Sequence, residues 1–243
     1  EIGARPGVAA SISVDGNMIV SGITTFGGAV NFPSTSGNVI TAGKLGIGFT
    51  DTNIKVGNTA LDSLTTGTYN TAVGNNALTA NTTGTRNTAV GSFALDATTT
   101  AEDNTAVGYG ALGAGSGSQN TAVGSKAADA LTTGSQNAVV GYEALTSATT
   151  GTYNTAVGFE AMKDDTTGSD NNAFGRQALA NNTTTNSNCA FGSVSLFTQT
   201  DGGTKNCAFG NSTLYSNTTG DSNCAFGDSA LYNNTTGTRN IAI

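Results

Sequence analysis

The stretch Asn70-Thr-Ala-Val-Gly-Asn-Asn-Ala-Leu-Thr-Ala-Asn-Thr-Thr-Gly-Thr-Arg86 is one copy of a 17-residue phrase that recurs from Asn53 onward. Its opening Asn returns at positions 53, 70, 87, 104, 120, 137, 154, 171, 188, 206, 223 and 240, with one interval of 16 residues and one of 18. Helical repeats need about 33 residues or more to hold a pair of helices, so this period indicates a solenoid of strands. We therefore predict an all-β fold, a parallel β-solenoid (β-roll) of about eleven coils over residues 44–243, with two short strands in each coil.

Each column of the repeat predicts a structural role. The residues between Asn and Gly are too few for a helix but suit a short strand, so Val and Ala should point to opposite faces. The Gly four residues after Asn is never replaced, which predicts a positive φ or a close backbone approach. We expect the Asn residues to form a buried ladder of amide hydrogen bonds, and Val and Leu to fill the interior. Representative structural positions are Asn70, Val73, Gly74, Leu78, Asn154, Val157 and Gly158.

The repeat changes toward the C-terminus. Phe replaces Val from Phe174 onward, at positions that include Phe191, Phe209 and Phe226. In the same coils Cys189, Cys207 and Cys224 take the position that earlier coils fill with Thr. We predict that the interior becomes more apolar along the chain, with Cys acting as a small buried hydrophobic residue. Disulfides between chains or between coils are the alternative.

The thinness of the coil predicts association. Val and Leu give little apolar cover, whereas ordering each residue costs about 1–2 kcal/mol of backbone entropy. Ala or Val occupies the face opposite the Val column in every coil except the first, which has Lys55. Small side chains allow another surface to approach closely. We predict a homotrimer with this Ala face toward the common axis, and with Lys55 where the axis opens.

Composition excludes several functional classes. The 243 residues include no His, so neither a Ser-His-Asp triad, a Cys-His pair nor a His metal site can form. The net charge of −7 disfavours nucleic acid and anionic membranes as partners. No apolar run approaches the ~20 residues of a membrane-spanning helix. We expect no enzyme, no catalytic residue, no cofactor and no metal.

Carboxylate pairs are the one remaining route to catalysis, since glycoside hydrolysis uses two of them. Asp96, Glu143 and Glu160 occupy variable positions, and the close pairs Glu102-Asp103 and Asp164-Asp165 lie in polar turns. We interpret all of these acids as solvated surface charges.

Residues 1–43 differ from the repeat and are predicted to form a separate β-strand or connector segment. Residues 11–26 show a strand, an Asp15-Gly16-Asn17 turn and a second strand. A capping hairpin that blocks edge-to-edge association is the alternative interpretation.

The phrase Asn-Thr-Ala-Val-Gly-x-x-Ala-Leu resembles the head repeats of trimeric autotransporter adhesins, whose consensus is close to Asn-Ser-Val-Ala-Ile-Gly-x-x-Ala. The resemblance covers residues 53–243, although the period here is longer than in those heads. It implies trimers of left-handed parallel β-rolls that bind host surfaces. The longer phrase is also similar to repeats in bacteriophage and large-virus tail fibres, where a trimeric shaft often precedes a self-cleaving chaperone domain.

Three functional classes follow from the repeat and its resemblance. The first is the structural shaft of a virion tail fibre that supports host attachment, located at the virion surface. The second is an extracellular bacterial adhesin or matrix filament, and the third is a fibre-borne glycan depolymerase. Besides other copies of the chain, the expected partner is a host-surface glycan or receptor. Contacts to it are expected from exposed variable pairs: Asn75-Asn76, Tyr109-Gly110, Tyr142-Glu143 and Phe159-Glu160.

Overall fold

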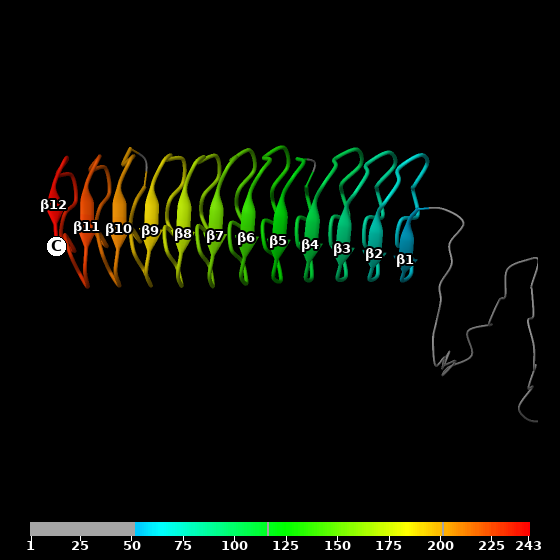
Figure 1. Ribbon diagram of the computed structural model, residues 1–243, viewed down its shortest axis with the longest axis horizontal. Helices are drawn as coiled ribbons and strands as arrows, with labels where there is room; N and C mark the ends of the chain where they lie inside the picture. The colour runs from blue at the N-terminus through cyan, green and yellow to red at the C-terminus, as the bar shows by residue number, and fades with distance from the viewer. Residues whose placement is uncertain (1–51, 116, 201) are drawn as a thin grey trace, which may run out of the picture. The chain divides into compact units, whose positions relative to one another are not determined.

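The computed structural model describes residues 52–115, 117–200 and 202–243, so the predicted segment 1–43 lies outside the described residues. This part is all-β, without a helix among its residues, and forms one 12-stranded sheet in chain order from β1 to β12. The strands lie side by side in a single row (Figure 1). Their bounds are β1 Ile54–Val56, β2 Thr71–Val73, β3 Thr88–Val90, β4 Thr105–Val107, β5 Thr121–Val123, β6 Ala138–Val140, β7 Thr155–Val157, β8 Asn172–Phe174, β9 Cys189–Phe191, β10 Cys207–Phe209, β11 Cys224–Phe226 and β12 Ile241–Ala242.

Neighbouring strands are parallel and in register with the repeat. Thr71 pairs with Thr88, Ala72 with Ala89 and Val73 with Val90, and the other pairs follow the same pattern. The shorter and longer intervals do not shift this register, because the length change is absorbed in the loops before β5 and β10. The predicted parallel β-solenoid with coils of about 17 residues is thus confirmed.

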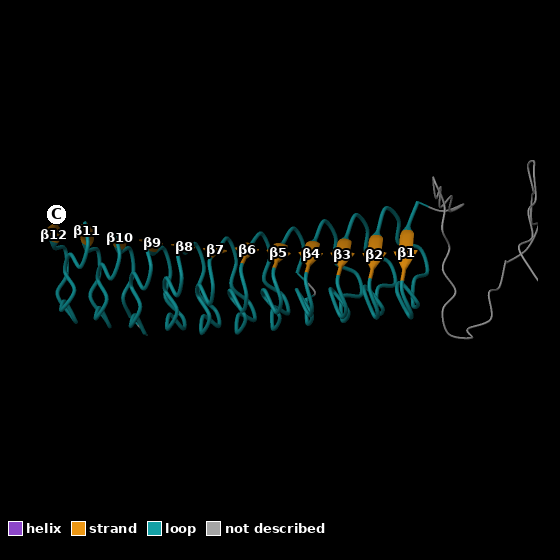
Figure 2. Cartoon of the chain, turned by 90° about the horizontal axis from the view of Figure 1, so that it is seen from below, coloured by secondary structure: helices purple, strands orange, loops and turns teal. Residues whose placement is uncertain are grey.

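Each coil contains one strand, so the prediction of two strands per coil is wrong. The strands line one side of the stack and loops make its other sides (Figure 2). The segment that carries Leu cannot be a strand because it contains residues with left-handed backbone. In coil 70–86, φ is +58° at Asn76, +51° at Leu78 and +57° at Arg86, and the equivalent positions of the other coils are also left-handed. Its backbone still hydrogen-bonds the next coil, as Leu78 N donates to Ala94 O at 3.0 Å.

The two faces of each strand are the reverse of the prediction. Ala72 and the other Ala residues of its column from β2 to β11 are fully buried within their own coil, and Val139 takes the same place in β6. The Val and Phe column points outward, with Val56 at 46% and Phe226 at 42% exposure. The space between the strand and the wall formed by Ala77 and Leu78 is narrow, so it mostly holds Ala, although β6 buries Val139 there. The Ala column is therefore not a surface for a partner chain, and Lys55 in that column is simply exposed.

The opening Asn residues form a continuous ladder through the interior. The Oδ1 atom of Asn53 accepts the backbone N–H of Asn70 at 2.8 Å, and the side-chain amide of Asn70 donates to Gly84 O at 2.9 Å. The same two bonds recur at Asn154, whose Oδ1 accepts from Asn171 N and whose Nδ2 donates to Gly168 O. A buried amide is tolerated at each level because its donor and acceptor are both satisfied.

The Gly that follows each strand has both expected properties. Its φ is +143° at Gly74 and +139° at Gly158, outside the range that side-chain-bearing residues adopt readily. A Cβ atom on either residue would overlap the carbonyl oxygen of the equivalent Gly in the next coil. The distance between coils therefore requires glycine in this column.

We predict that Gly141→Ala strongly destabilises the solenoid. Its φ is +146°, and a Cβ would overlap the Gly158 carbonyl oxygen, so backbone strain and overpacking should together cost about 3–5 kcal/mol. Urea unfolding followed by circular dichroism measures the loss. Gly227→Ala is the control, because φ is +114° there but the nearest atom is 4.0 Å from the Cβ. Equal effects of the two substitutions would show that the contact between coils is not the determinant.

Candidate functional site

The outward side of the strands forms a continuous surface, which we call the outer strand face. It consists of the first and third residues of each strand, mainly Thr and Val in β2–β7 and Cys and Phe in β9–β11. These residues are half-buried or exposed, and none of them carries a charge. A long uncharged row of Val and Phe is unusual on an isolated soluble surface and is typical of an interaction site.

Aromatic rings stack along the C-terminal part of this face. The centroids of Phe174 and Phe191 are 4.4 Å apart, those of Phe191 and Phe209 4.9 Å, and those of Phe209 and Phe226 5.0 Å. The stacking follows from the register, since equivalent residues of neighbouring coils lie one strand spacing apart. The predicted repacking of the interior by Phe is therefore wrong, and the change occurs on the outside of the coil.

The three cysteines lie beside the Phe row on the same face, half-buried and with free thiols. Strand pairing places Cys189, Cys207 and Cys224 in direct register. Burial, and next the neighbouring thiols of Cys189 and Cys224, raise the pKa of Cys207 to about 11. Burial also raises the pKa of Cys189. Thiols with raised pKa values are poor nucleophiles at neutral pH.

We predict that the cysteines do not crosslink the protein. The raised pKa values of Cys189 and Cys207 lower their thiolate fractions near pH 7, so these two thiols should react with Ellman's reagent at least tenfold more slowly in the native protein than after unfolding in guanidinium. Three thiols per chain should then react. A gel run without reductant should match one run with it, and bands of dimer or trimer seen only without reductant would contradict the prediction.

Several acids on the surface are paired with cations, as expected for solvated charges. Arg86 bridges Glu102 at 2.7 Å and Asp103 at 2.5 Å across neighbouring coils. Lys163 Nζ lies 3.2 Å from Glu143 Oε2 and 2.8 Å from Glu160 Oε1. Hydrogen bonds from Tyr142 and then Lys163 lower the pKa of Glu143, and the bond from Lys163 lowers that of Glu160. Carboxyl groups held ionised in this way do not suit a general acid.

Asp165 is the exception, because its side chain is fully buried in the coil and not in a solvated turn as predicted. Its carboxylate accepts the N–H of Gly168 at 2.7 Å and the amide of Asn182 at 2.6 Å. Burial raises its pKa to about 7 although both hydrogen bonds oppose the shift. The column that holds Asp165 contains Asn81, Asn182 and Asn217 in other coils, each of them buried.

We predict that Asp165→Asn stabilises the protein above pH 7. A native pKa above the unfolded value means that the folded chain binds the extra proton, so stability falls as pH rises from about 4 to about 7 and then levels off. Asn fits the column without a charge, and its gain at pH 8 should be about 2–4 kcal/mol. Urea unfolding between pH 4 and pH 8 measures it.

The control for this prediction is Asp164→Asn, which changes the adjacent exposed acid. It should leave the pH profile of stability unaltered. The prediction fails if Asp165→Asn has the same pH dependence as the unchanged protein.

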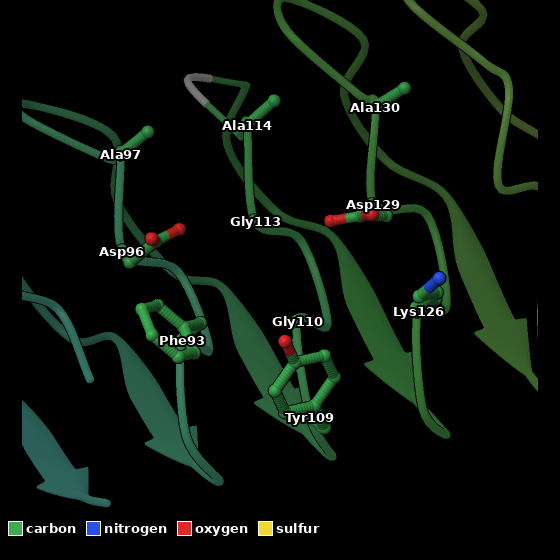
Figure 3. Close-up of a pocket in the computed structure, with 10 residues that line it drawn as sticks. All are labelled: Phe93, Asp96, Ala97, Tyr109, Gly110, Gly113, Ala114, Lys126, Asp129 and Ala130. Atoms are coloured by element: carbon green, nitrogen blue, oxygen red, sulfur yellow. The ribbon is translucent and has the colours of Figure 1, made fainter. Parts of the chain in front are cut away.

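A notch interrupts the surface where turns after β3, β4 and β5 meet, and we call it the Gly113 notch. Its volume is about 570 Å³, and its walls include Phe93, Asp96, Tyr109, Lys126 and Asp129. Asp96 and Asp129 occupy one column of the repeat two coils apart, and between them that column holds only Gly113. Figure 3 shows the two carboxylates pointing toward one another across Gly113. A Cβ at Gly113 would lie 2.5 Å from Asp129 Oδ1 and 3.6 Å from Asp96 Oδ1.

Electrostatics distinguish the notch from the paired surface acids. Burial raises the pKa of Asp96, and the nearby charge of Asp129 raises it further. Burial likewise raises the pKa of Asp129, while Lys126 opposes that shift. Both carboxyl groups are thus partly removed from water, and neither has the close ion pair that holds Glu143 and Glu160 ionised.

Sequence reasoning identified Tyr109-Gly110 as an exposed pair but treated Asp96 as an isolated solvated acid. The signal that could have identified the notch is the position of these residues in the repeat. Asp96, Gly113 and Asp129 each follow the opening Asn of their coil by nine residues, after Asn87, Asn104 and Asn120. Strand register places those three residues side by side. The interval between Asn104 and Asn120 is also the only one of 16 residues.

No cluster of three or more His, Cys, Asp or Glu in the described part of the chain is arranged to hold a metal ion. The described residues likewise contain no helix long and apolar enough to span a bilayer. Comparison of the chain with protein-family models, with curated proteins and with solved structures gives no match.

Proposed function

We propose that this chain is the structural shaft of a trimeric virion tail fibre, which supports attachment to a host surface. The observation that carries the proposal is the unbroken sheet from β1 to β12, in which every coil bonds to the next in one register. A bacterial surface adhesin would use the same assembly. The genes that adjoin the coding sequence would distinguish a viral tail fibre from a bacterial adhesin.

The internal bonding suits a load-bearing rod. Strand pairs, Asn amides and turn backbone all run between coils, as in Thr71 N to Asn87 O at 2.8 Å and Thr82 N to Thr99 O at 2.9 Å. Three separate lines of hydrogen bonds along one axis resist both bending and separation of neighbouring coils. This regular bonding makes the shaft stiff without requiring a thick hydrophobic core.

The outer strand face is the proposed seam between the three chains. It is uncharged although the chain has a net charge of −7, so identical copies can meet there without repulsion. The occupant is a second and third copy of this chain, because a repeat with constant register matches itself along its whole length. Burial of half-exposed Val and Phe side chains supplies the driving force.

We predict that the protein sediments with three times the mass of one chain. The double substitution Val123→Lys and Val140→Lys places two charges on the outer strand face and should shift the protein to monomers. Analytical ultracentrifugation measures the mass, and circular dichroism checks that the coils remain folded.

The matched control changes Thr133 and Thr150 to Lys in the same two coils, on exposed turn positions away from the strands. This control should remain trimeric. A monomeric unchanged protein would overturn the proposed assembly, and equal dissociation of both double variants would overturn the proposed seam.

A further inference from the structure

The Gly113 notch arises because one coil has glycine at two positions where the neighbouring coils have larger side chains. In the column that precedes Leu by two positions, neighbouring coils carry Phe93 and Lys126, whereas coil 104–119 carries Gly110. In the column that follows Leu by one position, the same coil carries Gly113 between Asp96 and Asp129. Two side chains are thus missing from one coil. The notch stays open beside Gly110, whereas the Asp129 carboxylate reaches over Gly113 (Figure 3).

The notch offers an apolar surface on one side and acceptors on the other. The rings of Phe93 and Tyr109 meet edge to face at 5.8 Å, and Tyr109 is 54% exposed. The carboxylates of Asp96 and Asp129 lie above these rings in Figure 3, and Lys126 stands at the side of Asp129. A ligand in this space therefore meets an aromatic ring, two acceptors and one cationic donor.

The chemistry of these groups selects a polyhydroxylated ring over a cation. A calcium ion takes six to eight oxygen ligands, whereas the notch offers two carboxylates, and the charge of Lys126 opposes a positive ligand beside Asp129. A sugar ring carries hydroxyl donors for both carboxylates, an oxygen that accepts from Lys126, and a C–H face that packs on an aromatic ring. The volume of about 570 Å³ lies within the range of small-ligand sites.

We propose that the Gly113 notch binds a saccharide, with one sugar ring packed on Tyr109 and its hydroxyl groups donating to Asp96 and Asp129. The notch lies on the turns after β3, β4 and β5, not on the outer strand face. The inference goes beyond the proposed shaft function and does not rest on it. Sedimentation reports trimer formation separately from binding.

Saturation-transfer NMR tests the proposal with five trisaccharides, built from α-linked glucose, β-linked glucose, galactose, mannose and N-acetylglucosamine. At least one should receive saturation at millimolar concentration. Gly110→Asn should abolish this transfer by filling the notch, and its backbone tolerates the change because φ is +62° and Asn76 occupies the same column with φ +58°. Asp96→Asn should weaken binding about tenfold by removing a charge-assisted hydrogen bond.

The controls introduce Asn in the same two columns of the repeat, outside the notch. Ser212→Asn repeats the first change in the same column of a distant coil, and Asp62→Asn repeats the second in the column of Asp96. Both should bind like the unchanged protein, and thermal melting confirms that all variants are folded. Absence of transfer to every trisaccharide would overturn the proposal, and so would binding that survives both Gly110→Asn and Asp96→Asn.

Discussion

The rest of the solenoid depends on the short distance between neighbouring coils. This distance requires glycine after each strand, because the carbonyl group of the equivalent glycine in the next coil lies directly against it. A Cβ on Gly74 or Gly158 would occupy the position of the next coil's carbonyl oxygen. With glycine in place, strands pair at their normal spacing, and the Asn amide of one coil reaches the backbone N–H of the next at 2.8–3.0 Å. Any other residue would separate both lines of hydrogen bonds at once.

The coil closes tightly because left-handed residues turn its backbone at three places, which in coil 70–86 are Asn76, Leu78 and Arg86. Leu78 and its equivalents hold φ near +50°, and all of them except the partly buried Leu231 are fully or almost fully buried. Such a backbone costs about 1–2 kcal/mol at each non-glycine residue. Burial of Leu and hydrogen bonds to the next coil offset this cost, and both depend on having neighbouring coils. The fold is therefore stabilised by stacking more than by any single coil.

Because the stacking is regular, a substitution at one position of the repeat changes the chemical properties of the structure at that place. Replacing Asn by Asp at position 165 leaves a buried carboxyl group with a pKa of about 7. Replacing larger residues by Gly110 and Gly113 opens a notch between two carboxylates. Changing Val to Phe and Thr to Cys produces a stacked aromatic row beside thiols of raised pKa. In each case the repeat determines the geometry, and the residues that differ from it in one or a few coils determine the local chemistry.

The sequence by itself determined the period, the parallel stacking, the strand position and the requirement for glycine. These properties follow from spacing and residue type, which repeat too regularly to allow another fold. Alternation also placed Ala72 and Val73 on opposite faces, but it could not determine which face is enclosed. Only the tertiary structure decided this, because the answer depends on which side of the strand the closed coil turns toward Leu78, and that side carries the Ala column. The same closure buried Asp165 and brought Asp96 to Asp129 across Gly113, since both results require residues of separate coils to meet in space.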